Sequence, residues 1–149
     1  MIAAFGPCEE PEPGLLAPPF HVRAVHLTRL TPEGAKLAEP DKPAKIMLGP
    51  MAGLPIVLAP PGDMLAIYVT EGIEDGLNLF QEYDFGVGIW AAGSAGNMPK
   101  MTERIPDFIE VVWIFGDKDE AGVRNAETAA RSLHARGHEV KIIYAGDAA

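Results

Sequence analysis

The chain has 149 residues and a formal net charge of −9, from 12 Lys and Arg against 21 Asp and Glu. This length suits one domain with its own core, and 48% apolar with 22% charged residues is ordinary for a globular protein. The acidic balance argues against a protein that grips nucleic acid unaided through a basic surface. A single cysteine, Cys8, excludes an internal disulfide and a cysteine-based zinc cluster.

We expect neither a membrane span nor a secretion signal. No apolar run approaches the roughly 18 residues that suggest a spanning helix. Residues 1–5 (MIAAF) carry no basic residue and are soon followed by acids and prolines, unlike a secretory leader. Together with the single cysteine, this predicts a cytoplasmic protein.

Proline divides the chain into three parts, because most of the 14 prolines lie at or before Pro61. Residues 1–20 are predicted to form a proline-rich extended lead-in. Residues 21–62 are expected to form a β-rich N-terminal extension, a small antiparallel cap with strands within 20–30, 45–48 and 55–59. Arg23, Arg29, Lys36, Lys42 and Lys45 concentrate there, either as a nucleic-acid surface or as a solvated sheet face.

Residues 63–149 are predicted to form an α/β core. Apolar runs at 65–70 (LAIYVT), 109–115 (IEVVWIF) and 139–144 read as strands that alternate with helices. That rhythm indicates right-handed βαβ units on a parallel sheet. The apolar stripes that should face the sheet are Ile73, Gly76, Leu77 and Phe80 on the first helix, and Gly122, Ala126, Ala129, Ala130 and Leu133 on the last.

Acidic residues follow two of these predicted strands. Glu71 comes directly after 65–70, and Asp117 and Asp119 come directly after 109–115. Because open α/β folds bind ligands at the carboxyl ends of their strands, we expect these carboxylates to meet at one edge. Asp75, four residues after Glu71, can share that side. Clustered carboxylates repel each other unless a cation relieves them, and their oxygens suit Mg²⁺ or Mn²⁺.

Each of these residues also has a purely structural interpretation. Asp119 could be the N-cap of the last helix, although that leaves Asp117 without a purpose. Glu71 could be an acid favoured by a helix N-terminus. The loop at 93–97 (GSAGN) fits no nucleotide-binding fingerprint and reads best as a plain turn, with Ser94 and Asn97 as candidates to line a cleft.

Taken in order, these motifs resemble the Toprim domain, which is shared by primases, topoisomerases and some nucleases. The resemblance rests on Glu71-Gly72 with Asp75, then Asp117-x-Asp119-x-Ala121-Gly122 at the end of a later strand. Residues 89–97 (IWAAGSAGN) and the segments 25–34 and 45–50 resemble the phage- and plasmid-type DNA primase branch. The match covers roughly residues 20 to 145.

The resemblance implies a Rossmann-like fold and metal-dependent phosphoryl or nucleotidyl transfer on nucleic acid during DNA replication. Asp117 and Asp119 would hold Mg²⁺ or Mn²⁺, Glu71 would act as general acid/base or further ligand, and Asp75 would be an additional ligand. Expected cleft residues are Gly72, Ser94, Asn97, Lys118 and Gly122. The implied partners are a single-stranded DNA template and NTPs. The chain lacks a zinc module, a helicase region and a basic template groove, so we expect other domains or proteins to assist it.

Three alternatives remain open at this point. A Toprim-type nuclease would use water in place of a hydroxyl nucleophile. A non-catalytic Toprim-like module would keep the acids only as a fold element or docking surface. A receiver-type phosphoacceptor is less well supported, because no lysine is convincingly placed at the matching strand end.

Overall fold

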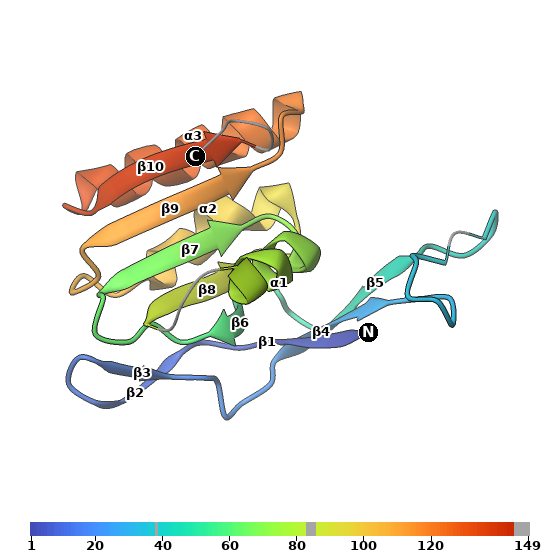
Figure 1. Ribbon diagram of the computed structural model, residues 1–149, viewed down its shortest axis with the longest axis horizontal. Coiled ribbons are helices and arrows are strands. Elements are labelled where there is room, and N and C mark those ends of the chain that lie inside the picture. Colours follow the sequence, from blue (N-terminus) through green and yellow to red (C-terminus); the bar gives the residue numbers. More distant parts are fainter. Residues whose placement is uncertain (38, 83–85, 145–149) are drawn as a thin grey trace.

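The computed structural model describes residues 1–37, 39–82 and 86–144. Its main layer is a five-stranded sheet with the order β10-β9-β7-β8-β6 (Figure 1). Four strands are parallel, and β6 pairs antiparallel with β8. The bounds of these strands are β6 Ile56–Ala59, β7 Ala66–Thr70, β8 Val87–Ala91, β9 Val111–Gly116 and β10 Glu139–Tyr144.

Helices cover both faces of this sheet, with α1 on one face and α2 and α3 on the other (Figure 1). Alternate side chains of the central strand β7 supply both sides: Ile67 and Val69 join the core under α3, whereas Tyr68 packs with Leu79 of α1. The helical segments are α1 Ile73–Glu82, η1 Ala95–Asn97, α2 Met98–Met101, η2 Thr102–Arg104 and α3 Glu120–Ala135. A parallel sheet flanked by helices is the predicted α/β class, which is confirmed.

The predicted helix stripes had different outcomes. In α3, Gly122, Ala126, Ala129 and Leu133 are buried and Ala130 is half-buried, as predicted. In α1 the buried positions are Ile73, Gly76 and Leu79, whereas Leu77 and Phe80 are 38% and 52% exposed. A Cβ at Gly76 would lie 2.5 Å from Leu58 Cδ1, so α1 rests on the sheet at Gly76. Residues three apart from it therefore face inward.

The N-terminal part contains more strands than predicted. A three-stranded antiparallel sheet has the order β1-β4-β5, and β2 and β3 form a hairpin. Residues 1–20 are therefore not merely an extended lead-in, since β1 pairs along β4. Residues 55–59 also differ from the expectation, because β6 is the edge of the main sheet and not a third strand of the cap. The bounds are β1 Ile2–Phe5, β2 Glu9–Glu12, β3 Leu15–Ala17, β4 Ala24–Thr28 and β5 Lys45–Leu48.

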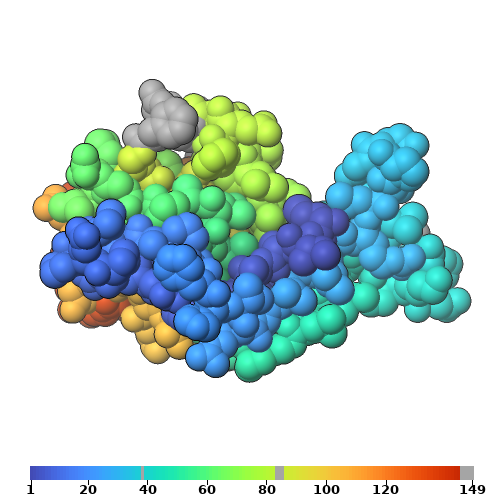
Figure 2. Space-filling view, turned by 90° about the horizontal axis from the view of Figure 1, so that it is seen from below, coloured from blue at the N-terminus to red at the C-terminus, as the bar shows by residue number. Residues whose placement is uncertain are grey.

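One apolar cluster joins the two sheets. Phe5 and Ala24 of the N-terminal sheet pack with Ile56 of β6, Ala91 of β8 and Ile73 of α1. Between β4 and β5, residues 29–37 and 39–44 project from this body as the cyan part of Figure 2. The described residues include no helix that is long and apolar enough to cross a membrane.

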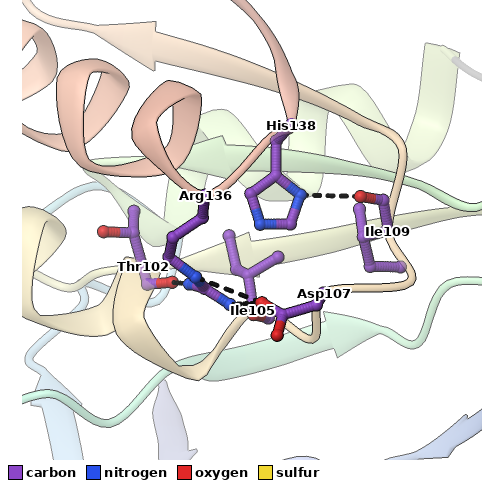
Figure 3. Close-up of polar contacts among 6 residues, drawn as sticks. All are labelled: Thr102, Ile105, Asp107, Ile109, Arg136 and His138. Carbon is purple, nitrogen blue, oxygen red and sulfur yellow. Dashed lines mark hydrogen bonds and ion pairs between the residues drawn. The ribbon is translucent and has the colours of Figure 1, made fainter.

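A polar clamp closes the edge of the sheet where β9 and β10 begin (Figure 3). Arg136, just after α3, donates to the carbonyl oxygen of Thr102 at 2.9 Å, to that of Ile105, and to the Asp107 carboxylate. His138 Nδ1 lies 2.6 Å from the Ile109 carbonyl oxygen, to which it donates. Gly137, with φ +95°, turns the chain between them in the left-handed conformation that glycine commonly adopts after a helix.

Candidate functional site at the carboxyl edge of the sheet

The acidic residues emerge from neighbouring parallel strands. Thr70, the last residue of β7, is paired with Phe115 of β9. Glu71 therefore leaves β7 level with the end of β9, where Asp117 follows Gly116. The turn after β7 is held by the Thr70 hydroxyl, which donates to the Gly72 carbonyl oxygen at 2.8 Å. Strand register thus brings the two acidic segments to the same edge of the sheet.

Glu71 is held in an unfavourable place for a charge. Burial raises the pKa of its carboxyl, and the negative charges of Asp117 and Asp119 raise it further. A hydrogen bond from the backbone N–H of Ala95 and the charge of Lys45 oppose that rise. The second oxygen, Oε2, is buried and has no hydrogen-bond partner in the structure. An acid with one oxygen fixed and the other unsatisfied is suited to accept a proton or a cation.

Asp75 belongs to the same electrostatic group. Burial raises the pKa of its carboxyl first, followed by repulsion from Asp117 and Glu74. The Asp75 carboxylate also occupies the space above Gly72, where a Cβ would lie 2.7 Å from Asp75 Oδ2. Glycine at position 72 therefore lets this carboxylate turn back toward the end of β7.

Asp117 and Asp119 have different surroundings. Asp119 is the N-cap of α3, and its Oδ1 accepts the Gly122 N–H at 2.6 Å, so the structural interpretation of this residue is correct. The side chain of Asp117 is exposed and makes no hydrogen bond or ion pair within the described residues. A Cβ at Gly122 would lie 2.5 Å from the Asp117 carbonyl oxygen. Gly122 thus acts through close packing of α3 against the acidic loop.

The remaining predicted cleft residues divide between surface and interior. Ser94 is half-exposed and its hydroxyl does not cap the following turn, while Lys118 is exposed. Asn97 does not line a cleft, because it is 3% exposed. Its Oδ1 accepts from Gly53 N at 2.7 Å, and its Nδ2 donates to the carbonyl oxygens of Leu54 and Ala92. Asn97 therefore joins the loop before β6 to the loop after β8.

Two parts of the site were not identified from the sequence. The Ala95 N–H that holds Glu71 carries no sequence signal, because every residue but proline has such a donor. Lys36, assigned to the cap by composition, pairs with Glu74 at 3.0 Å at the start of α1. Lys45 acts on the same group, since its charge lowers the pKa of Glu71 and of Glu74. The N-terminal extension therefore supplies cations to the acidic edge.

These residues fit a divalent ion in donor chemistry but do not form a closed cage. Among the described residues, no group of three His, Cys, Asp or Glu side chains is arranged to hold a metal. Mg²⁺, however, usually takes one or two protein carboxylates and completes its shell with water and substrate phosphates. The buried unsatisfied oxygen of Glu71 and the uncommitted carboxylate of Asp117 suit that kind of open site.

The fold and this edge define an α/β module with acids at the ends of adjacent parallel strands. A model of the Toprim domain family matches residues 66–148, more than half of the chain. The chain therefore belongs to the Toprim domain family, and the family prediction is confirmed.

The fold also resembles a crystal structure of a DNA primase domain from Pseudomonas aeruginosa, with a TM-score of 0.51 and 16% sequence identity. That alignment covers 95% of this chain and 48% of the primase domain, so the chain spans about half of that structure. At this identity the likeness establishes the fold alone. No curated protein sequence matches the chain significantly.

Proposed function

We propose that the acidic edge is the metal-dependent catalytic site of a nucleotidyl transferase of the DNA primase type. The observation that carries the proposal is the placement of Glu71 within the fields of Asp117 and Asp119, from two adjacent parallel strands. Such a concentration of negative charge is costly for a fold and is typical of a site that binds a cation. Membership of the Toprim family supports the same chemistry.

The roles follow from the surroundings of each residue. Asp117, with Asp119 and Asp75 beside it, would hold Mg²⁺ or Mn²⁺. The ion would neutralise charge on the triphosphate of an NTP and align its α-phosphate for in-line attack by a 3′-hydroxyl, with pyrophosphate as the leaving group. Glu71 would take the proton of that hydroxyl as a general base, since a carboxylate whose pKa is raised by burial and by neighbouring charges is a stronger base than an ordinary one.

Cations of the N-terminal extension would complete the site. The charge of Lys45 lowers the pKa of Glu71, and Lys36 forms an ion pair with Glu74 beside the acidic edge. Both are ammonium groups that can pair with phosphate oxygens. The partners proposed here are therefore NTPs and a single-stranded DNA template. Because the chain spans only 48% of the primase domain that it resembles, other domains or proteins would help to hold the template.

The test is an assay with single-stranded DNA and Mg²⁺ or Mn²⁺, with and without NTPs, together with the natural partner proteins. Extension products that require both metal and NTPs are expected. Glu71→Gln should lower their rate by about 10²-fold or more, the range of general acid–base catalysis. Glu110→Gln is the matched control, because Glu110 is an exposed acid at the opposite edge of the same sheet. Equal rates for the two variants would refute the proposed role of Glu71.

Two other functions give different results in this assay. A Toprim-type nuclease would shorten the DNA in the presence of metal without NTPs. A non-catalytic Toprim module is favoured by one observation, the lack of a three-ligand cluster among the described residues. It predicts no metal-dependent product in either arm, even with partners present.

A further inference from the structure

The loop between β5 and β6, residues 49–55, lines two neighbouring cavities. One has a volume of about 410 Å³ and is lined by Ala52, Gly53, Lys100, Glu103 and Arg104. The other, of about 300 Å³, is lined by Pro7, Arg23, Pro50, Ala52, Leu54 and Arg104. Since Ala52 and Arg104 line both, the cavities adjoin along one surface.

This surface collects cations that the protein leaves without acidic partners. In the part of the chain that the structure describes, several Lys and Arg side chains form ion pairs with acids, among them Arg29, Lys36, Lys42, Arg124, Arg131 and Arg136. Within the described residues, Arg23, Lys100 and Arg104 form none. Arg104 uses its Nε on the Gly53 carbonyl oxygen at 2.8 Å, which leaves its two terminal nitrogens available. In a chain with a net charge of −9, three such cations against the single carboxylate of Glu103 favour an anionic ligand.

The cationic surface is tied to the acidic edge through Asn97. This side chain binds the backbone of Gly53 and Leu54 on one side and of Ala92 on the other. Two residues earlier, the Ala95 N–H holds the Glu71 carboxylate. Ser94 and Gly96 belong to the same short loop, residues 93–97. Gly96 is exposed, with no atom within 4 Å of the position of a Cβ. The loop that connects the Gly53 segment to Glu71 is therefore open to solvent at Gly96.

We propose that the two cavities bind successive phosphates of a single nucleic-acid strand and lead it across residues 93–97 toward Glu71. This inference rests on the proposed function and deepens it by naming the surface that holds the template. Arg23, Lys100 and Arg104 make the contacts, because guanidinium and ammonium groups pair with phosphate oxygens. The cap residues Arg29 and Lys42, which the composition offered as part of a nucleic-acid surface, are instead engaged by Glu39.

The lining of the cavities indicates which part of the strand is recognised. No aromatic side chain is among the described residues that line them, so there is no platform on which a base could stack. Three cations spread over two adjoining cavities suit the repeated phosphates of a strand better than one isolated group. Binding at this surface therefore depends on the sugar–phosphate backbone of the strand and not on its base sequence.

The test measures binding of fluorescently labelled single-stranded DNA by anisotropy, at low salt and in EDTA. Arg23→Gln and Lys100→Gln should each weaken binding several-fold, equally for different sequences. Each should also reduce the slope of log K against log salt by about 0.7, the value for one phosphate contact to a single strand. Lys141→Gln is the matched control, because it removes the same charge from β10, where Lys141 is exposed and unpaired within the described residues. It should change neither quantity beyond a small general effect.

Further measurements distinguish a bound strand from a bound free nucleotide, and distinguish the strand-binding proposal from the proposed catalytic function. Inorganic triphosphate at concentrations that saturate a nucleotide site should displace the strand only partly; full displacement would assign the surface to a free nucleotide. Glu71→Gln should bind the strand at least as well as the wild type, because in EDTA no metal ion is available to link the acidic residues to the strand. Equal affinities of Arg23→Gln, Lys100→Gln and Lys141→Gln, or no strand binding at the lowest salt, would overturn the inference. A failure of the catalytic assay with these binding differences intact would refute only the proposed chemistry.

Discussion

At the edge where β9 and β10 start, the guanidinium of Arg136 donates to three acceptors. At the edge where β7 and β9 end, the carboxylate of Glu71 is instead repelled by the charges of Asp117 and Asp119. The first edge lowers the pKa of Asp107 by pairing its charge, and the second raises the pKa of Glu71 and Asp75. Both edges belong to one sheet and one core. The comparison separates charges that hold the fold together from charges that the fold has to accommodate.

The largest effect on stability is expected at the clamp. Arg136→Ala removes the donors from the carbonyl oxygens of Thr102 and Ile105, two residues that are fully buried. Each orphaned acceptor costs about 1–3 kcal/mol, so the loss of both should cost the variant about 2–6 kcal/mol of unfolding free energy. Urea denaturation measures this loss. Asp107→Asn, which weakens only the exposed ion pair, is the control and should change little; equal losses in the two variants would contradict this account.

The second prediction concerns the acidic edge and metal. Asp117→Asn should leave the melting temperature in EDTA unchanged or raised, because it removes a repulsive charge at constant volume. Mg²⁺ or Mn²⁺ should raise the melting temperature of the wild type. At an ion concentration one hundred times Kd, binding adds about 2.7 kcal/mol to the free energy of unfolding. The variant should respond less.

A structural Asp117 predicts the reverse of this result. The variant would then lose on the order of 1–3 kcal/mol with or without metal, and the wild type would be indifferent to the ion. Thermal melts of both proteins, in EDTA and in excess Mn²⁺, decide between the two outcomes.

The smallest effect is a difference in the sign of pH dependence between the two edges. The pKa of Glu71 is higher in the folded protein than in the unfolded chain, where it is about 4.3. As the pH falls, the folded protein therefore binds this proton at a higher pH than the unfolded chain does, which favours folding. Glu71→Gln removes this unfavourable charge, so the variant should be more stable than the wild type near neutral pH, and acidification in EDTA should narrow that difference. The pKa of Asp107 is lowered in the folded protein, so the stability that its ion pair contributes is lost as the pH falls. The wild type should be slightly more stable than Asp107→Asn near neutral pH, and acidification should remove that difference. Denaturant midpoints across the acid range test both; shifts of the same sign would remove the contrast.

Much of the acidic edge could be predicted from the sequence because its logic is local. The apolar runs at 65–70 and 109–115 become β7 and β9, and the residue that follows a strand must leave at the end of that strand. Parallel pairing then brings Glu71 and Asp117 to one edge. The cap role of Asp119 was also recognisable, since its position before an apolar-striped helix is that of an N-cap.

The features that the sequence did not reveal depend on tertiary contacts. Asn97 has the composition of a turn residue, and only the approach of the Gly53 loop turns it into a buried bridge. Prolines suggested an extended lead-in at residues 1–20, yet β2 accommodates Pro11 in a two-stranded ribbon, where an edge tolerates a missing donor. Leu77 and Phe80 fit an inward stripe by spacing, but the seating of α1 at Gly76 turns them outward.

The antiparallel edge strand β6 has a consequence for any attempt to cut the protein into smaller units. The family match begins at residue 66, whereas β6 ends at Ala59 and completes the sheet beside β8. A fragment limited to the matched region would leave β8 with a row of unpaired N–H and C=O groups and would uncover Ala91 and Ile73. Such an open edge recruits strands from other molecules, so the fragment would tend to self-associate. A fragment meant to keep this edge of the sheet covered therefore has to include β6 and begin no later than Ile56.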